Sequence, residues 1–314
     1  MMSKKLLVVG ELNVDLILNG IQGFPKVGTE IVADSMDFTV GSSSAIMASN
    51  ISALGIDTSF CGIVGDDKFG NFLLEELQQK NVNTRFIKQL KKYNTGVTVV
   101  LNYDQDRANV TYCGAMNALN INDIPWDNIK EFSHFHISNY FLQEGIKKDI
   151  TLIFKKAKAA GLSTSLDLQY DPEETWDFDF KDCLPFVDIF LPNEIELLAL
   201  TGKASIEDAL KTLKPFANTI ALKLGKDGSR LVNQIMNIEA APFINKNYKD
   251  AIGAGDSFNA GFIQKFLAGA SLEECLKNAN LMGSLNTTGS GGTSAFSSPE
   301  YIEQQRRLIL NQQK

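Results

Sequence analysis

The segment Asp250-Ala-Ile-Gly-Ala-Gly-Asp-Ser-Phe258 joins a glycine-rich turn directly to an apolar helix that extends to about Phe266. Two glycines around an alanine allow backbone N–H groups to point inward without obstruction by side chains. At a helix N-terminus such amides lack partners and the helix dipole adds partial positive charge, so the turn suits a phosphate group. Asp256 stands beside it, where a carboxylate can take a proton from an attacking hydroxyl. Taken alone, the segment fits an ordinary aspartate N-cap after a glycine turn at least as well.

Short apolar runs and amphipathic stretches alternate along most of the chain. Strands are expected at residues 6–9, 59–64, 135–137, 164–168, 189–191 and 220–224, with 16–18 as a continuation or partner of the first. Helices are expected at residues 43–54, 69–80, 145–160, 194–202, 206–216, 256–268 and 272–286. This alternation predicts an α/β fold in which helices cover the faces of a parallel sheet.

One region departs from this rhythm. Residues 96–101 and 109–112 flank the polar turn Asp104-Gln-Asp-Arg107, a pattern that predicts an antiparallel hairpin. Together with strands near residues 12–18 and 30–40, the hairpin would form a small sheet that projects from the main body.

Length, charge and cysteine content limit the class of protein. We expect one α/β domain over residues 1–314, with a small β-sheet lid formed by roughly residues 11–40 and 94–115. The formal net charge of −7 argues against nucleic-acid binding, which needs a basic face. The four cysteines include no Cys-x-x-Cys pair, so buried free thiols are expected. The apolar run before Gly10 is too short for a signal peptide or a membrane span, which predicts a cytoplasmic protein without a membrane partner.

Polar residues follow two of the later strands. Asn193 and Glu196 lie between an apolar strand and a helix, where their oxygens suit a hydrated Mg²⁺. The same pair also fits a capping box at the start of the helix. Leu222-Lys-Leu-Gly-Lys-Asp-Gly228 ends another strand with glycines spaced for the approach of a nucleotide. There Lys223 or Lys226 would meet phosphate or ribose, or else lie in a solvated turn.

Polar residues near the first strand suit a polyhydroxylated ligand. Gly41-Ser-Ser-Ser-Ala45 begins a helix, so its hydroxyls either cap the helix or bind a ligand. Asp15 either bridges two sugar hydroxyls or lies at an exposed strand edge.

His134 and His136 alternate on one face of a strand without an evident third ligand. For them we expect a buried, hydrogen-bonded structural role rather than a metal site.

Taken in order, these segments resemble the PfkB-type, or ribokinase-like, carbohydrate kinase family over nearly the whole chain. The resemblance is carried by Val9-Gly-Glu-Leu-Asn-Val-Asp15, residues 41–55, residues 62–70, Pro192-Asn-Glu-Ile-Glu196, residues 222–225 and the highly specific residues 250–261. It implies a Rossmann-like α/β sandwich with a β-sheet lid. It also implies transfer of the γ-phosphoryl group of ATP to a sugar hydroxyl, and a homodimer that pairs through the lid.

The resemblance further implies roles for single residues. Asp256 would be the general base, and the anion hole would be formed by the amides of Gly253, Ala254 and Gly255. The nucleotide would be bound by Asn193, Lys223, Gly225, Gly228 and Asn280, while Glu196 would hold Mg²⁺ through water. A monovalent cation, K⁺, would lie among Asp250, Ile252, Asn286 and Gly291. The sugar would be faced by Asp15, Gly41, Ser42, Ser43, Asn139, Gln169 and Asp171.

The chain departs from the family pattern mainly on the substrate side. Ser43 stands where phosphosugar kinases commonly have a lysine, and Ile46 where a sugar-binding asparagine is frequent. Asp171 stands where relatives that take acidic sugars offer an arginine, and a carboxylate there would repel an anion. These changes favour a neutral monosaccharide, fructose-like or ribose-like. The alternatives are a nucleoside kinase of the same fold and a non-catalytic protein that senses a sugar or nucleotide.

Overall fold

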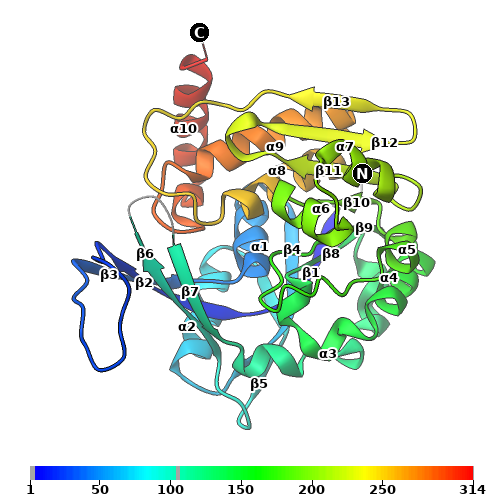
Figure 1. Cartoon of the computed structure of the whole chain (residues 1–314). Coiled ribbons are helices and arrows are strands. Elements are labelled where there is room, and N and C mark those ends of the chain that lie inside the picture. The colour runs from blue at the N-terminus through cyan, green and yellow to red at the C-terminus, as the bar shows by residue number, and fades with distance from the viewer. Residues whose placement is uncertain (1–3, 104–106, 314) are drawn as a thin grey trace.

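The computed structural model describes residues 4–103 and 107–313, and its centre is a nine-stranded sheet (Figure 1). The strand order is β13-β12-β11-β10-β9-β8-β1-β4-β5. Strands from β5 to β11 run parallel, whereas β12 and β13 are antiparallel additions at one edge. The strands are β1 (Lys5–Val9), β4 (Asp57–Gly65), β5 (Asn83–Leu90), β8 (His134–Ser138), β9 (Ser163–Asp167), β10 (Ile189–Phe190), β11 (Thr219–Lys223), β12 (Ser229–Asn233) and β13 (Asn237–Ala240).

Helices cover both faces of this sheet, as the alternating pattern predicts. Successive residues of β1 point to opposite faces, so Leu6 and Val8 enter one core while Leu7 and Val9 enter the other. The first core contains side chains of α1 (Ser43–Ala53), α2 (Lys68–Gln79), α8 (Ala254–Leu267) and α9 (Leu272–Asn286). The second contains side chains of α3 (Glu144–Lys147), α4 (Ile150–Ala159), α5 (Phe180–Cys183), α6 (Glu194–Thr201) and α7 (Ile206–Leu213). A last helix, α10 (Pro299–Asn311), packs against α9.

A second sheet of four strands, ordered β3-β2-β6-β7, projects to one side of the large one (Figure 1). Its strands are β2 (Asn13–Asn19), β3 (Ser35–Val40), β6 (Gly96–Asn102) and β7 (Arg107–Tyr112). Strands β6 and β7 form the predicted antiparallel hairpin, although residues 104–106 of its expected turn lie outside the described residues. All four strands fall within the ranges expected for the lid, and we use the name lid for this sheet.

Some elements differ from the sequence-based expectation. Strand β2 joins the lid, as expected for residues 12–18, and does not continue β1, which was the other expectation for residues 16–18. Asn13, Asp15 and Asn19 could not line an apolar core as β1 does. The structure also contains β5, β12, β13 and α10, which were not expected. Strand β5 lies at the sheet edge and is only half-buried, so it has no apolar run for the pattern to show.

Among the described residues, no helix combines the length and the apolar character needed to cross a membrane.

The two histidines lie fully buried on one face of β8, opposite serines of β9. Every ring nitrogen forms a 2.7 Å hydrogen bond with a serine hydroxyl: His134 with Ser163 and Ser165, and His136 with Ser165 and Ser138. Burial lowers the pKa of both imidazoles, that of His136 to about 3. Both rings are therefore neutral and fully bonded, which is the structural role that the sequence predicted.

Replacing His136 by glutamine is expected to make the protein's stability less sensitive to acid. Because the folded-state pKa is lowered to about 3, the unfolded chain binds more protons than the folded chain below the ordinary histidine pKa. His136 therefore removes roughly 1.4 kcal/mol of unfolding free energy for each pH unit below about 6.5, and glutamine does not. Urea unfolding of both proteins at about pH 7.5, 6 and 5 measures this difference. Stability profiles that stay parallel over this range would contradict the role assigned to burial.

Candidate active site

The glycine-rich turn leads into α8 as predicted, but the helix begins two residues earlier, at Ala254. Gly253 is its N-cap residue and has a φ of 76°. The amides of Gly255 and Asp256 lie in the first turn, where an α-helix supplies no acceptor of its own. The Ala254 amide instead donates to the Ala251 carbonyl at 3.1 Å. The anion hole stays a prediction, and without the Ala254 amide it would consist of the amides of Gly253, Gly255 and Asp256.

Asp256 is the buried acid of this site, with 7% of its surface exposed. Gln169 Nε2 donates to Asp256 Oδ1 at 3.3 Å, which brings the predicted base and a predicted sugar-binding residue together. Burial, and then the nearby Asp167 carboxylate, raise the pKa of Asp256 well above its ordinary value, while Lys223 opposes them. A carboxyl group with a raised pKa is a stronger base at neutral pH than an ordinary aspartate, which suits proton abstraction from a hydroxyl.

Lys223 forms a buried ion pair behind Asp256, with 2.8 Å between its Nζ and Asp167 Oδ2. The same Asp167 oxygen accepts hydrogen bonds from Gln169 Nε2 and Asn259 Nδ2. Removing one partner of such a pair would leave a buried uncompensated charge. The ion pair thus fixes the ammonium group at the end of β11, close to the anion hole.

Asn193 and Glu196 form a complete capping box at the start of α6. Asn193 Oδ1 accepts from the Glu196 amide at 2.9 Å, and the Glu196 carboxylate accepts from the backbone and side-chain N–H groups of Asn193. Burial, and then Asp167, raise the pKa of Glu196, which Lys223 counteracts. Because both carboxylate oxygens already accept hydrogen bonds, the pair would hold a Mg²⁺ ion through bridging water, and this ion stays a prediction. The described residues contain no cluster of three or more His, Cys, Asp or Glu side chains able to hold a metal ion directly.

A cavity of about 480 Å³ opens beside the anion hole. Predicted nucleotide-binding residues line it together with the start of α8: Lys223, Gly225, Gly228, Asn280, Ala254 and Gly255. Apolar side chains that sequence reasoning did not single out form another wall: Pro242, Phe243, Ile244 and Tyr248. Asn280 Nδ2 donates to the carbonyls of Ala240 and Ala241, so it also holds the wall in place. Asn193 is not among the lining residues.

The residues predicted around a monovalent cation lie together but are bonded to one another. The Asp250 carboxylate accepts from the amides of Ile252 and Gly291, each at 2.8 Å. The Ile252 carbonyl, a predicted cation ligand, accepts from Asn286 Nδ2 at 2.6 Å. The oxygens expected to bind a cation thus already accept N–H groups, and the cation stays a prediction from the resemblance.

The lid side of the site is rich in buried carboxylates. Asp15 accepts from Asn13 Nδ2 at 2.9 Å, and burial raises its pKa to about 7, against the effects of Asn13 and Arg107. A Cβ atom at Gly41 would lie 2.1 Å from the Asp15 carboxylate, so this position needs glycine. Burial also raises the pKa of Glu11, which lies close enough to Asp15 to raise that group's pKa further.

Glu11 also accepts hydrogen bonds from serines at the start of α1, two of which, Ser42 and Ser43, were predicted to face the sugar. Ser43 Oγ donates to its carboxylate at 3.2 Å, and Ser44 donates through both its amide and its hydroxyl. Ser42 Oγ donates to the Glu11 carbonyl at 2.6 Å and accepts the Ala45 amide as the N-cap of α1. The serines therefore orient Glu11 and cap the helix, and only the half-buried Ser43 lies near enough to the surface to meet a ligand as well.

Asn139 and Asp171 were both predicted to face the sugar, but they differ in their hydrogen bonding. Asn139 follows β8 with a left-handed φ of 58°, and its Oδ1 is buried without a hydrogen-bond partner among the described residues. Asp171, by contrast, accepts from the amides of Glu173 and Trp176 and from the Thr175 hydroxyl. Donors from its own loop thus occupy the Asp171 carboxylate, and its contact with sugar hydroxyls stays a prediction.

The match to known proteins identifies the family. Residues 3–299 match the family described as pfkB family carbohydrate kinase. The chain belongs to this family. The kinase is similar to ribokinase of Arabidopsis thaliana, with 29% identity over 290 residues that cover 89% of this chain and 75% of the relative. It is also similar to an ATP-dependent ribose-1-phosphate kinase of Halopiger xanaduensis, with 27% identity over 296 residues, 93% of this chain and 94% of the relative.

The fold of the kinase agrees with its family. A solved structure of Arabidopsis thaliana ribokinase with ribose and ATP superposes with a TM-score of 0.84, at 25% identity, over 98% of this chain and 99% of that chain. The kinase therefore has the ribokinase-like α/β sandwich with a small sheet that the sequence predicted. The two named relatives act on a sugar and on a sugar phosphate respectively, so membership of the family leaves the acceptor of this carbohydrate kinase open.

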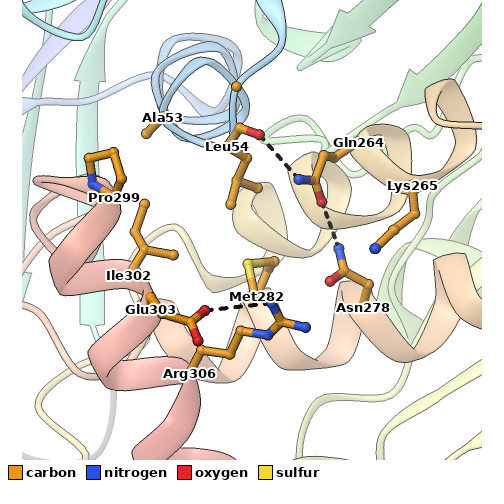
Figure 2. Close-up of a pocket in the computed structure, with 11 residues that line it drawn as sticks. Ala53, Leu54, Gln264, Lys265, Asn278, Met282, Pro299, Ile302, Glu303 and Arg306 are labelled. Carbon is orange, nitrogen blue, oxygen red and sulfur yellow. Dashed lines mark hydrogen bonds and ion pairs between the residues drawn. The ribbon is translucent and has the colours of Figure 1, made fainter.

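A second cavity of the kinase, of about 340 Å³, lies among α1, α8, α9 and α10 (Figure 2). None of the predicted site residues lines it. Gln264 bridges the Leu54 carbonyl and Asn278, while Glu303 forms an ion pair with Arg306. These polar groups bond to one another, and the candidate active site is therefore kept at the start of α8, where the predicted residues lie together.

Sequence reasoning did not single out the buried carboxylates of Glu11 and Asp167, which contact predicted site residues. Both follow or end a buried strand at its carboxyl edge, which is where ligands bind in open parallel sheets. That position at the carboxyl edge of the sheet was the signal that could have found them.

Proposed function

We propose that this carbohydrate kinase transfers the γ-phosphoryl group of ATP to a hydroxyl of a neutral monosaccharide, fructose-like or ribose-like. The observation that carries the proposal is the buried carboxyl of Asp15 on the lid side of Asp256. The nearby Glu11 carboxylate already accepts hydrogen bonds from Ser43 and Ser44. Carboxylate oxygens accept hydrogen bonds from sugar hydroxyls, and they repel a second anion in a poorly solvated pocket. A neutral polyol therefore fits this surface better than a sugar phosphate.

Asp256 would act as the general base of the transfer. The attacking hydroxyl donates to the Asp256 carboxylate, which takes the proton as the new O–P bond forms and the bond from phosphorus to the leaving ADP oxygen breaks. Gln169 holds the carboxylate through its 3.3 Å hydrogen bond. The amides of Gly255 and Asp256 face the charge that builds up on the phosphoryl oxygens. Mg²⁺, held through water near Asn193 and Glu196, would neutralise charge on the ATP phosphates.

One observation favours a second candidate, an anionic sugar. A cavity of about 500 Å³ between the lid and residues 248–252 is lined by Arg107 and Lys249. Arg107 also lowers the pKa of both Asp15 and Asp256, so its charge reaches the acceptor side of the site. In this reading the sugar would carry its carboxylate or phosphate toward Arg107.

An ATP-coupled assay over neutral sugars, sugar acids, sugar phosphates and nucleosides separates these readings. We expect the highest kcat/KM for a neutral sugar. We expect Arg107→Gln to change this kcat/KM by less than about threefold, since a neutral acceptor carries no charge that could pair with Arg107. A higher kcat/KM for a sugar acid or sugar phosphate, lost in Arg107→Gln, would replace the proposal by the anionic reading. Preference for a nucleoside would favour the nucleoside kinase alternative. Tight binding of a sugar without ATP consumption would contradict catalysis altogether.

A further inference from the structure

A closed ring of buried hydrogen bonds surrounds the glycine turn, and Asn50 of α1 is part of it. Asn50 Nδ2 donates to Ser257 Oγ and to the Gly292 carbonyl, each at 2.9 Å. Ser257 Oγ donates to Asn286 Oδ1 at 2.9 Å, and Asn286 Nδ2 donates to the Ile252 carbonyl. The ring closes through the bonds of Asp250 to the amides of Ile252 and Gly291. Asn50, Ser257 and Asn286 are completely buried.

The donors in this ring have only one consistent arrangement. Two carbonyl oxygens, of Gly292 and Ile252, can only accept, so each must face an amide nitrogen, of Asn50 and Asn286 respectively. That orientation leaves Asn286 Oδ1 as an acceptor, which takes the single hydroxyl proton of Ser257. Ser257 Oγ must then accept from Asn50. Exchanging the oxygen and nitrogen of Asn50 would place two acceptors against each other, which is unfavourable in a buried site.

The ring connects the predicted anion hole to helix α1 and to the Gly291–Gly292 turn. Ser257 directly follows Asp256, and the Gly291–Gly292 turn lies against Gly253, where a Cβ atom would be 2.6 Å from the Gly292 Cα. Ile46, one helical turn before Asn50, contacts both glycines with its side chain. Helix α1 therefore meets the turn twice, through the apolar contact of Ile46 and through the amide group of Asn50.

We propose that Asn50 is a positioning residue for phosphoryl transfer. Through its hydrogen bonds to Ser257 and Gly292, it keeps the amides of Gly255 and Asp256 and the Asp256 carboxylate at fixed positions relative to one another. The inference rests on ATP-dependent phosphoryl transfer, which the family supplies, and not on the identity of the sugar. Asn50 touches neither reactant. Its influence is on geometry, to which phosphoryl transfer is sensitive because catalysis is mostly positioning and electrostatic stabilisation.

Asn50→Leu tests this proposal, with Ser49→Ala as the matched control. Leucine keeps the size of the side chain but removes both N–H donors. Ser49 lies beside Asn50 in α1, is equally buried, and has a hydroxyl without a partner among the described residues. We expect kcat of Asn50→Leu to fall by about 10–100-fold while KM for ATP stays within about threefold. The control should retain its kinetic constants.

A double-mutant cycle with Ser257→Ala separates positioning from general damage. If Asn50 acts through Ser257, the double variant loses little more kcat than either single variant, because the ring is already open. Losses that multiply, or an Asn50→Leu enzyme with unchanged kcat, would overturn the proposal. If Asn50→Leu does not fold, Ser257→Ala and Asn286→Leu open the ring elsewhere and must show the same loss in kcat. The assay uses the acceptor that gives the highest rate, and a wild-type enzyme inactive on every acceptor would contradict the proposed function instead.

Discussion

Replacing Asp256 by asparagine is expected to lower kcat by about 10²–10⁴-fold while the dissociation constant for ATP changes little. Asparagine keeps the shape and the hydrogen bond from Gln169 but cannot accept the proton of the attacking hydroxyl. The nucleotide cavity is lined by Gly255 and Lys223 but not by Asp256, which is why ATP binding should survive. Steady-state kinetics and calorimetric titration with ATP measure the two quantities separately.

Loss of folding cannot account for such a result. The folded-state pKa of Asp256 is raised, so its stabilising contribution is present at low pH and is lost as the pH rises through that pKa. Above it, the buried charge costs stability that the neutral asparagine does not, and Asp256→Asn should unfold at the same temperature as the wild type or a higher one. Asp66→Asn, at an exposed aspartate, is the control. Turnover near the wild-type rate in Asp256→Asn would exclude Asp256 as the base.

Replacing Gly253 by alanine is expected to abolish most activity and to destabilise the fold by several kcal/mol. The positive φ of 76° costs an alanine about 1–2 kcal/mol by itself. In addition, the new Cβ would lie 2.6 Å from the Gly292 Cα, and a packed backbone cannot move aside as a flexible side chain can. The turn would have to shift and carry the amides of Gly255 and Asp256 with it. Urea unfolding and kcat measure the two effects.

Gly161→Ala is the matched control for this substitution. Gly161 has a φ of 89°, but no atom lies within 4 Å of the place that an alanine Cβ would take, so alanine there meets only the backbone cost. We expect Gly161→Ala to lose about 1–2 kcal/mol and no activity. Equal destabilisation by the two substitutions would show that the contact with Gly292 does not constrain the turn.

The parts of the site that the sequence predicts correctly are those encoded in one short segment. The turn at Gly253 and the place of Asp256 in the first turn of a helix follow from neighbouring residues, because helix N-termini are local structures. The start of α8 was predicted to within two residues. The partners of Asp256 do not follow in this way. Asp167 and Lys223 are 56 residues apart, and only the order of strands β9, β10 and β11 brings them together.

Other predicted side chains have a second use within the fold, and their contacts with the sugar stay predictions. From the sequence, Asp171 had no evident local partner. In the structure its carboxylate accepts hydrogen bonds from three donors within the next five residues. Loop contacts of this kind leave no periodic pattern in the sequence. The hydroxyls of Ser42 and Ser43 were expected either to cap the helix or to bind the sugar. In the structure Ser42 caps the helix, and both hydroxyls donate to Glu11, across 31 and 32 residues. For Asn193 and Glu196, the capping box and a water-mediated role near Mg²⁺ are compatible, so the structure establishes the first without deciding the second.

The lid is built from two insertions, one directly after β1 and the other after β5, whereas the anion hole and the nucleotide cavity belong to the last hundred or so residues of the chain. Under the proposed function, the lid residues that would meet the acceptor and the cavity that would bind ATP are thus encoded in separate stretches of the gene. Mutations in the lid can alter which acceptor is recognised while the phosphoryl-transfer apparatus stays under its own selection. A modular layout of this kind lets one reaction be retained while lineages diverge in the sugars they consume.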